Sequence, residues 1–448
     1  MGEGPGGAAA GPRAGRRKGA HRLTAREWLL LLVLAAVQFT HIVDFMIIMP
    51  LGPTYIREMH LTTEQFGAVV AAYTVSAGVA ALVASRVVDR FGRKAALLTL
   101  YAGFTTGTFL CGVVTTYWAL LAARTVAGAF GGVAAALVLA CVGDAFPDAR
   151  RGAATGVVMS AFSVASIAGV PLGLQLEHWF DWHAPFLALG GLGVAVLALA
   201  AVLLPPLRGH LGRAPARPGP KWRLFTEPNH LRAFALTVAL AFGSFTLFPF
   251  LATFLESNVG MGHEQLGLMY VCGGLATLVT LTPIGRLADH LGKLPVFRLC
   301  AAATLGLILV ITNLPAGTAL AAILAVTTVF WITSSGRMVP AMAMITASAA
   351  PQDRGGFMSL NAAVQHLANG AATYLAGRLI GGTEGQPLEG FPVVGLVAGV
   401  ATAASIVLAG RLRPAPDGDL APDAPEVGRA ARAGTPMPAV AAPVDVSP

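Results

Sequence analysis

The sequence has few charged residues for its length. Only 12% of its 448 residues are Asp, Glu, Lys or Arg, and 55% are hydrophobic. Soluble globular proteins carry roughly 25% charged residues. A soluble protein so poor in charge would lack the polar surface that keeps it dissolved, so the composition excludes a soluble chain and indicates a membrane protein.

Cysteines and nucleotide-binding motifs are also scarce. The four cysteines lie in apolar segments without the spacing of metal ligands, so we interpret them as small packing residues. The sequence has no phosphate-binding loop, so ATP-driven transport would need a partner protein that supplies the nucleotide site. We therefore expect no cofactor and no metal.

Long apolar runs are what the sequence has in abundance. A helix that crosses a bilayer needs about 20 predominantly apolar residues. Twelve runs of roughly this length alternate with short charged segments. We predict a transmembrane helix in each of them: 28–51, 64–84, 95–115, 118–142, 153–176, 185–204, 233–255, 265–285, 296–314, 319–348, 357–377 and 392–411.

The basic residues predict the orientation of these helices, because Lys and Arg are retained on the cytoplasmic side. With the N-terminus inside, 26 of the 30 basic residues fall in cytoplasmic segments. Arg57 and Arg378 fall on the outer side, while Arg124 and Arg337 lie within predicted helices. We expect a bacterial-type inner (plasma) membrane protein with both termini in the cytoplasm. The net charge of +8 is then an insertion signal and does not indicate nucleic-acid binding.

Composition divides the chain into five parts. Residues 1–27 form a basic tail and residues 413–448 a Pro- and Ala-rich tail, and both are expected to be disordered. Between them we predict a six-helix bundle at 28–204, a basic cytoplasmic linker at 205–232 and a second six-helix bundle at 233–412. The first apolar run is too long for a secretion signal and no small-residue cleavage site follows it, so we interpret it as a retained helix.

The two halves resemble each other at an offset of 200 residues. Glu64-Gln65-Phe66-Gly67 matches Glu264-Gln265-Leu266-Gly267, and Ser85–Arg93 matches Gly285–Lys293. Arg151-Gly152 also matches Arg354-Gly355 at a slightly larger offset. Parallel repeats of this kind place a substrate path between the halves, near the membrane midplane.

The repeated segments resemble a known family. Ser85–Lys94 is similar to the loop signature between the second and third helices of the major facilitator superfamily, and Gly285–Lys293 is similar to its weaker second copy. In the first copy Ser85 replaces the opening Gly, and in the second His290 replaces an Arg. Neither departure changes the expected fold.

Other motifs extend the resemblance to residues 28–411. Leu120-x3-Arg124-x3-Gly128 resembles the family's fourth-helix motif, and Gly169-Val170-Pro171-Leu172-Gly173 resembles its fifth-helix antiporter motif. Asp44–Leu51 and Ser335–Pro340 look like the drug:proton antiporter branch. The resemblance implies an all-α membrane protein, the major facilitator fold, with 12 transmembrane helices in two pseudo-symmetric six-helix bundles.

Asp44 is the only acidic residue well inside the twelve runs. A lone carboxylate in hydrocarbon costs several kcal/mol, so it needs a partner or a proton. Asp44 lies about 10 Å from the outer end of its run, and Arg124 lies about 9 Å below the same surface. Equal depth makes a pair possible, and the resemblance also implies one. Proton coupling and a static structural pair both remain open.

Further polar residues in the runs are candidates for the substrate cavity. Gln38 and His41 share a helix face with Asp44, although a lone His is more often a packing residue. Arg337 has no obvious acidic partner in its half, so it could meet Asp44, a backbone carbonyl or the cargo, or reach the inner surface. Asn361 and Gln365 could line the cavity or simply join helices.

The loop signature and the fifth-helix motif are candidates for conformational control. Gly92 is expected to adopt positive φ in a tight turn, and Asp89 to contact the positive end of the helix that starts near Gly355. Positive-inside topology alone explains Arg93. Gly169, Pro171 and Gly173 favour close packing and a local break. The other gating candidates are Arg90, Asp289 and Gly292.

These features favour a secondary transporter that works by alternating access. The first hypothesis is a monomeric, proton-driven exporter of small amphipathic compounds, with a small-molecule substrate, protons and the lipid bilayer as its partners. A sugar or metabolite carrier on the same scaffold is the alternative. A membrane enzyme would need clustered His or acidic residues at the surface, and a non-transporting sensor would need a sizeable soluble output domain; the sequence has neither.

The orientation can be tested directly. We expect a reporter that is active only outside the cytoplasm, fused after Arg413, to give no signal, because an even helix count and the basic bias keep both termini inside. A cytoplasmically active reporter at the same position is the control. A strong signal from the outside reporter would overturn the twelve-helix topology.

Overall fold

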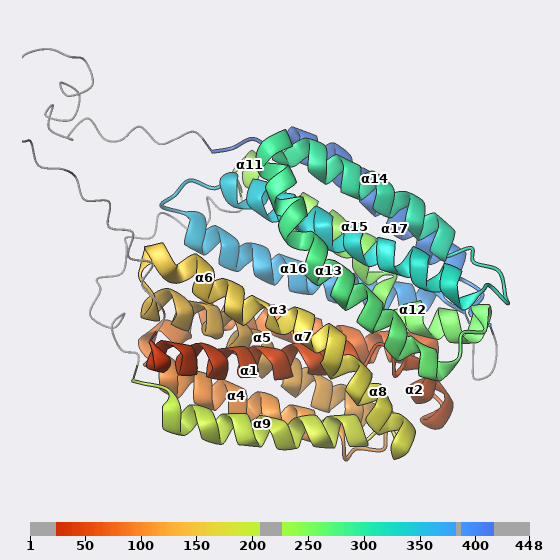
Figure 1. Ribbon diagram of the computed structural model, residues 1–448, viewed down its shortest axis with the longest axis horizontal. Helices are drawn as coiled ribbons and strands as arrows, with labels where there is room; N and C mark the ends of the chain where they lie inside the picture. Colours follow the sequence, from red (N-terminus) through yellow and green to blue (C-terminus); the bar gives the residue numbers. More distant parts are fainter. Residues whose placement is uncertain (1–23, 207–225, 382–386, 416–448) are drawn as a thin grey trace, which may run out of the picture.

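The structure is a computed structural model that describes residues 24–206, 226–381 and 387–415. Every regular element in these ranges is helical (Figure 1). Most of the predicted linker and tails, 1–27, 205–232 and 413–448, therefore lies outside the described residues, and their boundaries stay predictions.

The first half of the chain contains nine α-helices, one 3-10 turn and one π-helical turn within the described residues. In chain order they are α1 (Ala25–Ile47), α2 (Gly52–Glu58), α3 (Thr63–Val87), η1 (Val88–Arg90), α4 (Arg93–Cys111), α5 (Tyr117–Ala145), α6 (Asp148–Met159), α7 (Ala161–Val164), η2 (Ala165–Gly169), α8 (Val170–Trp179) and α9 (Ala184–Leu203).

The second half contains seven α-helices and one π-helical turn within the described residues. Its elements are α11 (Pro228–Phe245), α12 (Phe248–Phe254), η3 (Leu255–Val259), α13 (His263–Leu291), α14 (Lys293–Ile311), α15 (Leu320–Ala347), α16 (Arg354–Leu379) and α17 (Phe391–Arg411). Each of the twelve predicted runs thus contains helix, which agrees with the predicted fold class.

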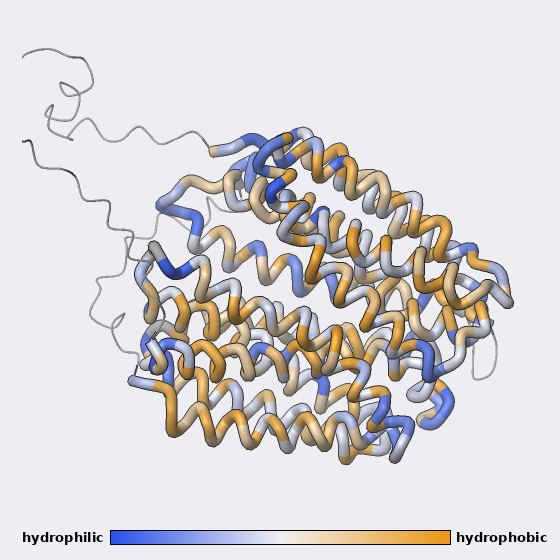
Figure 2. Tube along the Cα trace, in the orientation of Figure 1, coloured by the Kyte–Doolittle hydropathy of each residue, from blue (hydrophilic) through white to orange (hydrophobic). Residues whose placement is uncertain are grey.

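Ten helical segments of the described chain are long and apolar enough to cross a membrane. The other two predicted spans correspond to α4 and α16. The helix α4 begins with Arg93 and Lys94, and α16 has hydrophilic stretches along its length (Figure 2). Both helices pack against others, α4 on α5 and α9, and α16 on α3 and α11. Packing against protein lets them carry polar residues at membrane depth.

Two predicted runs are interrupted where the sequence analysis expected continuous helix. In the run 28–51, α1 ends at Ile47 and α2 begins at Gly52. The run 233–255 is interrupted between Phe245 and Phe248. Pro50 lies in the first break, and Pro249 lies in the first turn of α12, just after the second. Proline lacks the N–H that a helix interior needs, but it fits the first turn of a helix.

The predicted positive φ of Gly92 is wrong. Gly92 precedes α4 with φ −61° and ψ 135°, an extended conformation that any residue adopts. The repeat counterpart Gly292 has φ 94° between α13 and α14, where a residue with a side chain would be strained. The first copy of the loop avoids this turn because η1 precedes Gly92 there.

The halves lie side by side, with the first half below and the second above in Figure 1. We call the end at which α1 begins and α17 finishes the terminal end, and the other the opposite end. At the terminal end each half has its own core, around Leu31 and Phe146 in the first and around Phe234 and Phe357 in the second. At the opposite end one core joins both halves, including Phe66 and Phe250.

Polar contacts also close the opposite end. Thr63 Oγ1 donates to the carbonyl of Ile380 at 2.6 Å, and Tyr374 Oη donates to Glu64 Oε1 at 3.0 Å, in both cases between α3 and the end of α16. The Phe66 and Phe250 rings meet edge to face with centroids 5.7 Å apart. The two halves are therefore held together at this end.

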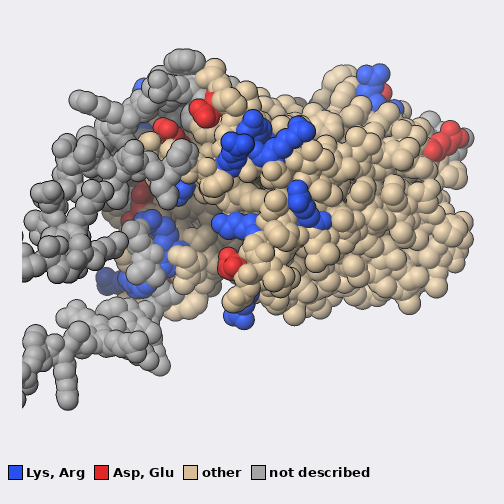
Figure 3. Space-filling model, turned by 90° about the horizontal axis from the view of Figure 1, so that it is seen from above, with Lys and Arg blue, Asp and Glu red and all other residues tan. Residues whose placement is uncertain are grey.

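Charge is unevenly distributed on the surface. On the face shown in Figure 3, Lys and Arg gather toward the side where the termini lie, and a broad uncharged band follows. Such a band suits contact with the hydrocarbon of a bilayer.

Candidate functional site

Asp44 on α1 and Arg124 on α5 form an ion pair in the interior of the first half. Arg124 Nη1 lies 2.9 Å from Asp44 Oδ2 and also donates to the Asp44 carbonyl at 3.3 Å. Neither side chain is exposed at all. The contact predicted from equal membrane depth is therefore present. In a region of low dielectric, each charge offsets the burial of the other.

Several polar atoms of the pair have no hydrogen-bond partner among the described residues. The Arg124 guanidinium carbon lies 4.4 Å from the centre of the Tyr73 ring, a cation–π contact. Asp44 Oδ1 and Arg124 Nε and Nη2 make no hydrogen bond to the described residues. The same holds for the hydroxyls of Tyr73 and Tyr55 nearby on α3 and α2. The single Nη1–Oδ2 contact leaves Asp44 able to take a second partner.

The fifth-helix motif lies against the helix that carries Asp44. The π-helical turn η2 ends at Gly169, just before Pro171 in the first turn of α8, so the predicted break is a widened turn. A side chain at Gly169 would collide with Val43, and one at Gly173 would meet Ile47. These two residues flank Asp44 on α1, so the glycines let α8 pack closely against this part of α1.

Arg337 on α15 is fully buried but has no acidic partner among the described residues. Its Nη2 donates to Ser244 Oγ on α11 at 2.8 Å, and its Nη1 donates to Thr402 Oγ1 on α17 at 3.2 Å. Two neutral hydroxyls thus replace the partners that the sequence analysis considered. The alternative that Arg337 reaches the inner surface is wrong, because its side chain is enclosed by the three helices.

The repeat relates Asp44 to Ser244, one of the two partners of Arg337. At the offset of 200, Asp44 corresponds to Ser244 and Phe45 to Phe245. The Phe45 and Phe245 rings lie 6.0 Å apart, so equivalent positions of the two halves meet at the interface. An acid in the first half thus corresponds to a hydroxyl in the second, and Asp44 has no acidic counterpart there.

His41 and Gln38 lie on the Asp44 face, as predicted, but neither contacts the pair. The His41 ring packs between the rings of Tyr73 and Phe104, with centroid distances of 6.0 and 5.8 Å. Its two ring nitrogens and Gln38 Oε1 have no partner among the described residues. They remain candidates for contact with cargo or protons.

Asn361 and Gln365 on α16 differ in their surroundings. Asn361 Oδ1 accepts a hydrogen bond from Thr237 Oγ1 of α11 at 2.7 Å and is buried, so it joins two helices of the same half. Gln365 is partly exposed and stays a cavity candidate.

A chain of aromatic rings, which was not predicted from the sequence, crosses between the halves. The Phe45 ring lies next to that of Phe245, whose centroid is 6.4 Å from that of Phe248. The Phe248 ring in turn lies tilted against Trp331, with centroids 5.0 Å apart. These four side chains are only partly buried. Aromatic residues in apolar runs could not be assigned to a cavity because packing residues give the same signal.

The loop-signature residues are only partly described. The Asp89 side chain lies outside the described residues, so its predicted contact with α16 stays a prediction. Arg90 is exposed, and Arg93 Nε lies 2.9 Å from Asp144 Oδ2 of α5. Arg93 therefore joins α4 to α5 in addition to any topological role. Asp289 is exposed near the end of α13, beside the turn at Gly292.

A second missed group lies at the opposite end. His263, Glu177 and Glu256 form a cluster there across the two halves, with ring-nitrogen to carboxylate-oxygen distances of 2.8 and 2.9 Å. The only signal in the sequence was the presence of acids in outer segments that carry few basic residues.

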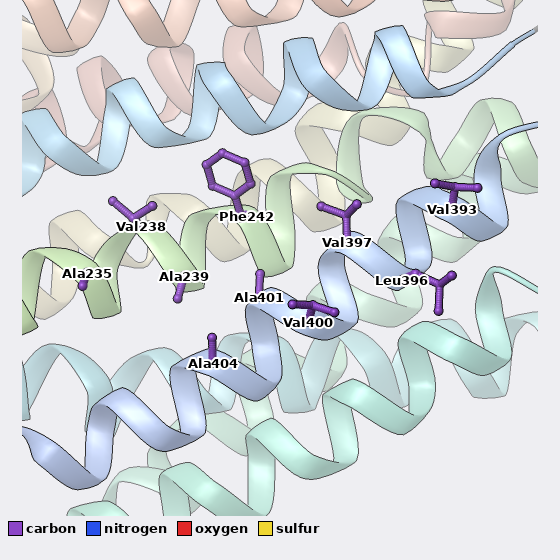
Figure 4. A pocket seen from close by; sticks show the side chains of 10 residues that line it. All are labelled: Ala235, Val238, Ala239, Phe242, Val393, Leu396, Val397, Val400, Ala401 and Ala404. Atoms are coloured by element: carbon purple, nitrogen blue, oxygen red, sulfur yellow. The ribbon is translucent and has the colours of Figure 1, made fainter.

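An apolar pocket of about 660 Å³ lies between α11 and α17 (Figure 4). Several of its side chains are exposed, so it opens on the bundle surface, where lipid tails would cover it. It offers no polar or titratable side chain, so we do not assign the transport site to it. Its lining residues are Ala235, Val238, Ala239, Phe242, Val393, Leu396, Val397, Val400, Ala401 and Ala404.

Comparison with known proteins gives a consistent picture. The sequence model of the Major Facilitator Superfamily matches residues 34–242 and 233–441, one match in each half. The chain is 26% identical over 362 residues to the uncharacterized MFS-type transporter YceJ of Bacillus subtilis, covering 80% of this chain and 90% of that protein. It is 27% identical over 363 residues to the inner membrane transport protein YdhP of Escherichia coli K12, covering 79% and 89%.

Two further similarities are narrower. A chloramphenicol resistance protein of Streptomyces lividans is 26% identical over 244 residues, covering 54% of this chain and 62% of that protein. The crystal structure of a bacterial homologue of the human lysosomal transporter Spinster superposes with a TM-score of 0.65 at 15% identity, covering 87% of this chain and 95% of that one. At this identity the superposition supports the fold alone.

Removing one member of the buried pair should destabilise the protein more than removing both charges. We expect Arg124→Met to lower the free energy of unfolding by about 3–5 kcal/mol, because it leaves the Asp44 carboxylate buried and unpaired. The double variant Asp44→Asn/Arg124→Met should recover part of the loss. Thermal unfolding of the purified variants in the same detergent measures both effects. A double variant no more stable than Arg124→Met would contradict this account of the pair.

Proposed function

Because this chain belongs to the Major Facilitator Superfamily and is a multi-pass membrane transporter, we propose that it exports small amphipathic compounds in exchange for protons. The observation that carries this proposal is the buried Asp44–Arg124 pair. Asp44 is the only carboxylate within the predicted spans away from their ends, and its Oδ1 has no hydrogen-bond partner among the described residues.

The proposed coupling is a competition for Asp44. While Arg124 contacts the carboxylate, the charged form is favoured; when rocking of the halves or the arrival of cargo weakens the contact, burial favours the protonated form. A proton taken up from outside would be released to the cytoplasm when Arg124 pairs with Asp44 again. In the structure Tyr73 packs against the guanidinium that pairs with this carboxylate.

The proposed cargo site lies where the two halves meet. Phe45, Phe245, Phe248 and Trp331 offer a partly exposed aromatic surface that begins at Phe45, the neighbour of Asp44 in the sequence. Gln365 and His41 offer hydrogen-bonding groups. Flat or amphipathic molecules suit such a surface. The similarity to a chloramphenicol resistance protein makes chloramphenicol a reasonable first probe.

The proposed orientation has the terminal end in the cytoplasm of a bacterial inner membrane and the opposite end outside. In this orientation the structure is closed to the outside by the shared core around Phe66 and Phe250. We propose that a monomer is the working unit, because the two halves within one chain already provide a path between them.

Asp44→Asn should abolish uphill transport. In vesicles with an imposed pH gradient, we expect wild-type protein to accumulate chloramphenicol, or a better cargo found by screening an expressing strain against a compound panel. Asp44→Asn should let the compound only equilibrate, because the amide cannot exchange a proton. The matched control is Asp181→Asn, which alters an exposed acid just before α9 and should retain accumulation. If Asp44→Asn vesicles still pump uphill at the wild-type rate, Asp44 is structural.

A further inference from the structure

His263 connects the two halves at the opposite end. It is the first residue of α13 in the second half, and its Nε2 lies 2.8 Å from Glu177 Oε2 of α8 in the first half. Its Nδ1 lies 2.9 Å from Glu256 Oε2 of the neighbouring η3. The imidazole is thus held between two carboxylates, one from each half, and all three side chains are at most 23% exposed.

The geometry fixes the number of protons in this cluster. Each of the two short nitrogen–oxygen contacts needs one proton between its atoms. A neutral imidazole carries only one, and an ionised carboxylate carries none. The cluster therefore holds one proton more than a neutral His with two carboxylates, wherever that proton resides.

The surrounding charges agree with this count. Arg57 of α2 lies 3.7 Å from Glu256 Oε1, and Thr54 of the same helix donates to Glu177 Oε1 at 2.9 Å. With a protonated His263, two positive groups then balance two carboxylates. The next titratable pair, His178 and Glu264, is highly exposed and 3.8 Å apart, so water screens it more strongly. No group of three or more His, Cys, Asp or Glu among the described residues has the arrangement of a metal site.

We propose that His263, Glu177 and Glu256 form a proton-binding latch that holds the outer side closed. Alternating access requires the halves to separate at this end, which breaks the contact between His263 and Glu177. Only Glu256 then faces the His263 ring. A neutral imidazole already carries the one proton that the remaining hydrogen bond needs, so the extra proton can leave. The closed state therefore binds one proton more than the open state, and a lower outer pH favours closure.

This latch rests on the proposed alternating access but acts differently from Asp44. Its proton enters and leaves on the same side, so it is not carried across the membrane. A low outer pH would favour protonation of Asp44, and it would also favour closure of the outer side after that protonation. The latch thus sets the pH dependence of the conformational step, while Asp44 sets the coupling.

The test measures outer-side closure without any cargo. Spin labels at Thr115→Cys and Ala316→Cys, exposed positions in the equivalent outer loops of the two halves, report their separation by pulsed electron paramagnetic resonance. The four native cysteines are replaced by serine, and the protein is held in lipid nanodiscs from about pH 5 to about pH 9. Variants are His263→Gln and Glu177→Gln. His183→Gln is the matched control, because that His lies 3.2 Å from Asp181 within one half.

We expect acidification to shift the wild-type population toward the short distance. The ratio of closed to open molecules should change by up to about tenfold per pH unit, the limit for one linked proton. His263→Gln and Glu177→Gln should each flatten this dependence, and His183→Gln should leave it unchanged. Thermal unfolding checks that the variants are folded.

A pH-independent wild-type distance would overturn the latch, as would a His263→Gln variant with the wild-type pH dependence. If Asp44→Asn alone removes the dependence, the sensor is Asp44 and the latch is again overturned. Failure of uphill transport in vesicles with a normal latch response would instead contradict the proposed function while leaving the latch intact, because the distance measurement requires no transport.

Discussion

Two opposite charges buried together away from both membrane surfaces are the constraint on which this structure depends. Neither Asp44 nor Arg124 is exposed, and each charge offsets the cost of burying the other. The local packing maintains the contact: the Tyr73 ring lies against the guanidinium, and Gly169 and Gly173 bring α8 against α1 on either side of Asp44. The contact has only one short side-chain bond, and we propose that a proton can replace it while the fold is kept.

The two halves use their equivalent positions differently. The repeat makes Ser244 the counterpart of Asp44, and Arg337 binds Ser244 and Thr402, so the second half contains a buried cation with neutral partners. In the proposed mechanism, the proton that drives transport binds only in the first half, at Asp44, whereas the second half supplies His263 to the proposed outer latch. The difference between the halves would then separate the coupling proton from the proton that favours closure.

Much of the fold could be predicted because a membrane helix can be recognised in the sequence as a long run of apolar residues. The Asp44–Arg124 contact was also predictable, since counting residues from the helix ends gives depth. The breaks near Pro50 and Pro249 were missed because apolar residues continue through them. Partners of Arg337 could not be identified because Ser and Thr usually bond to their own helix, and the latch joins residues whose proximity depends on how the halves meet.

Infrared difference spectroscopy tests the central claim most directly, because a protonated carboxyl in an apolar site absorbs apart from a carboxylate. The account predicts that acidifying purified wild-type protein in lipid produces a protonated-carboxyl band that is absent in Asp44→Asn but kept in Glu177→Gln. If wild-type and Asp44→Asn proteins give the same bands across the pH range, Asp44 never exchanges Arg124 for a proton, and the account is wrong.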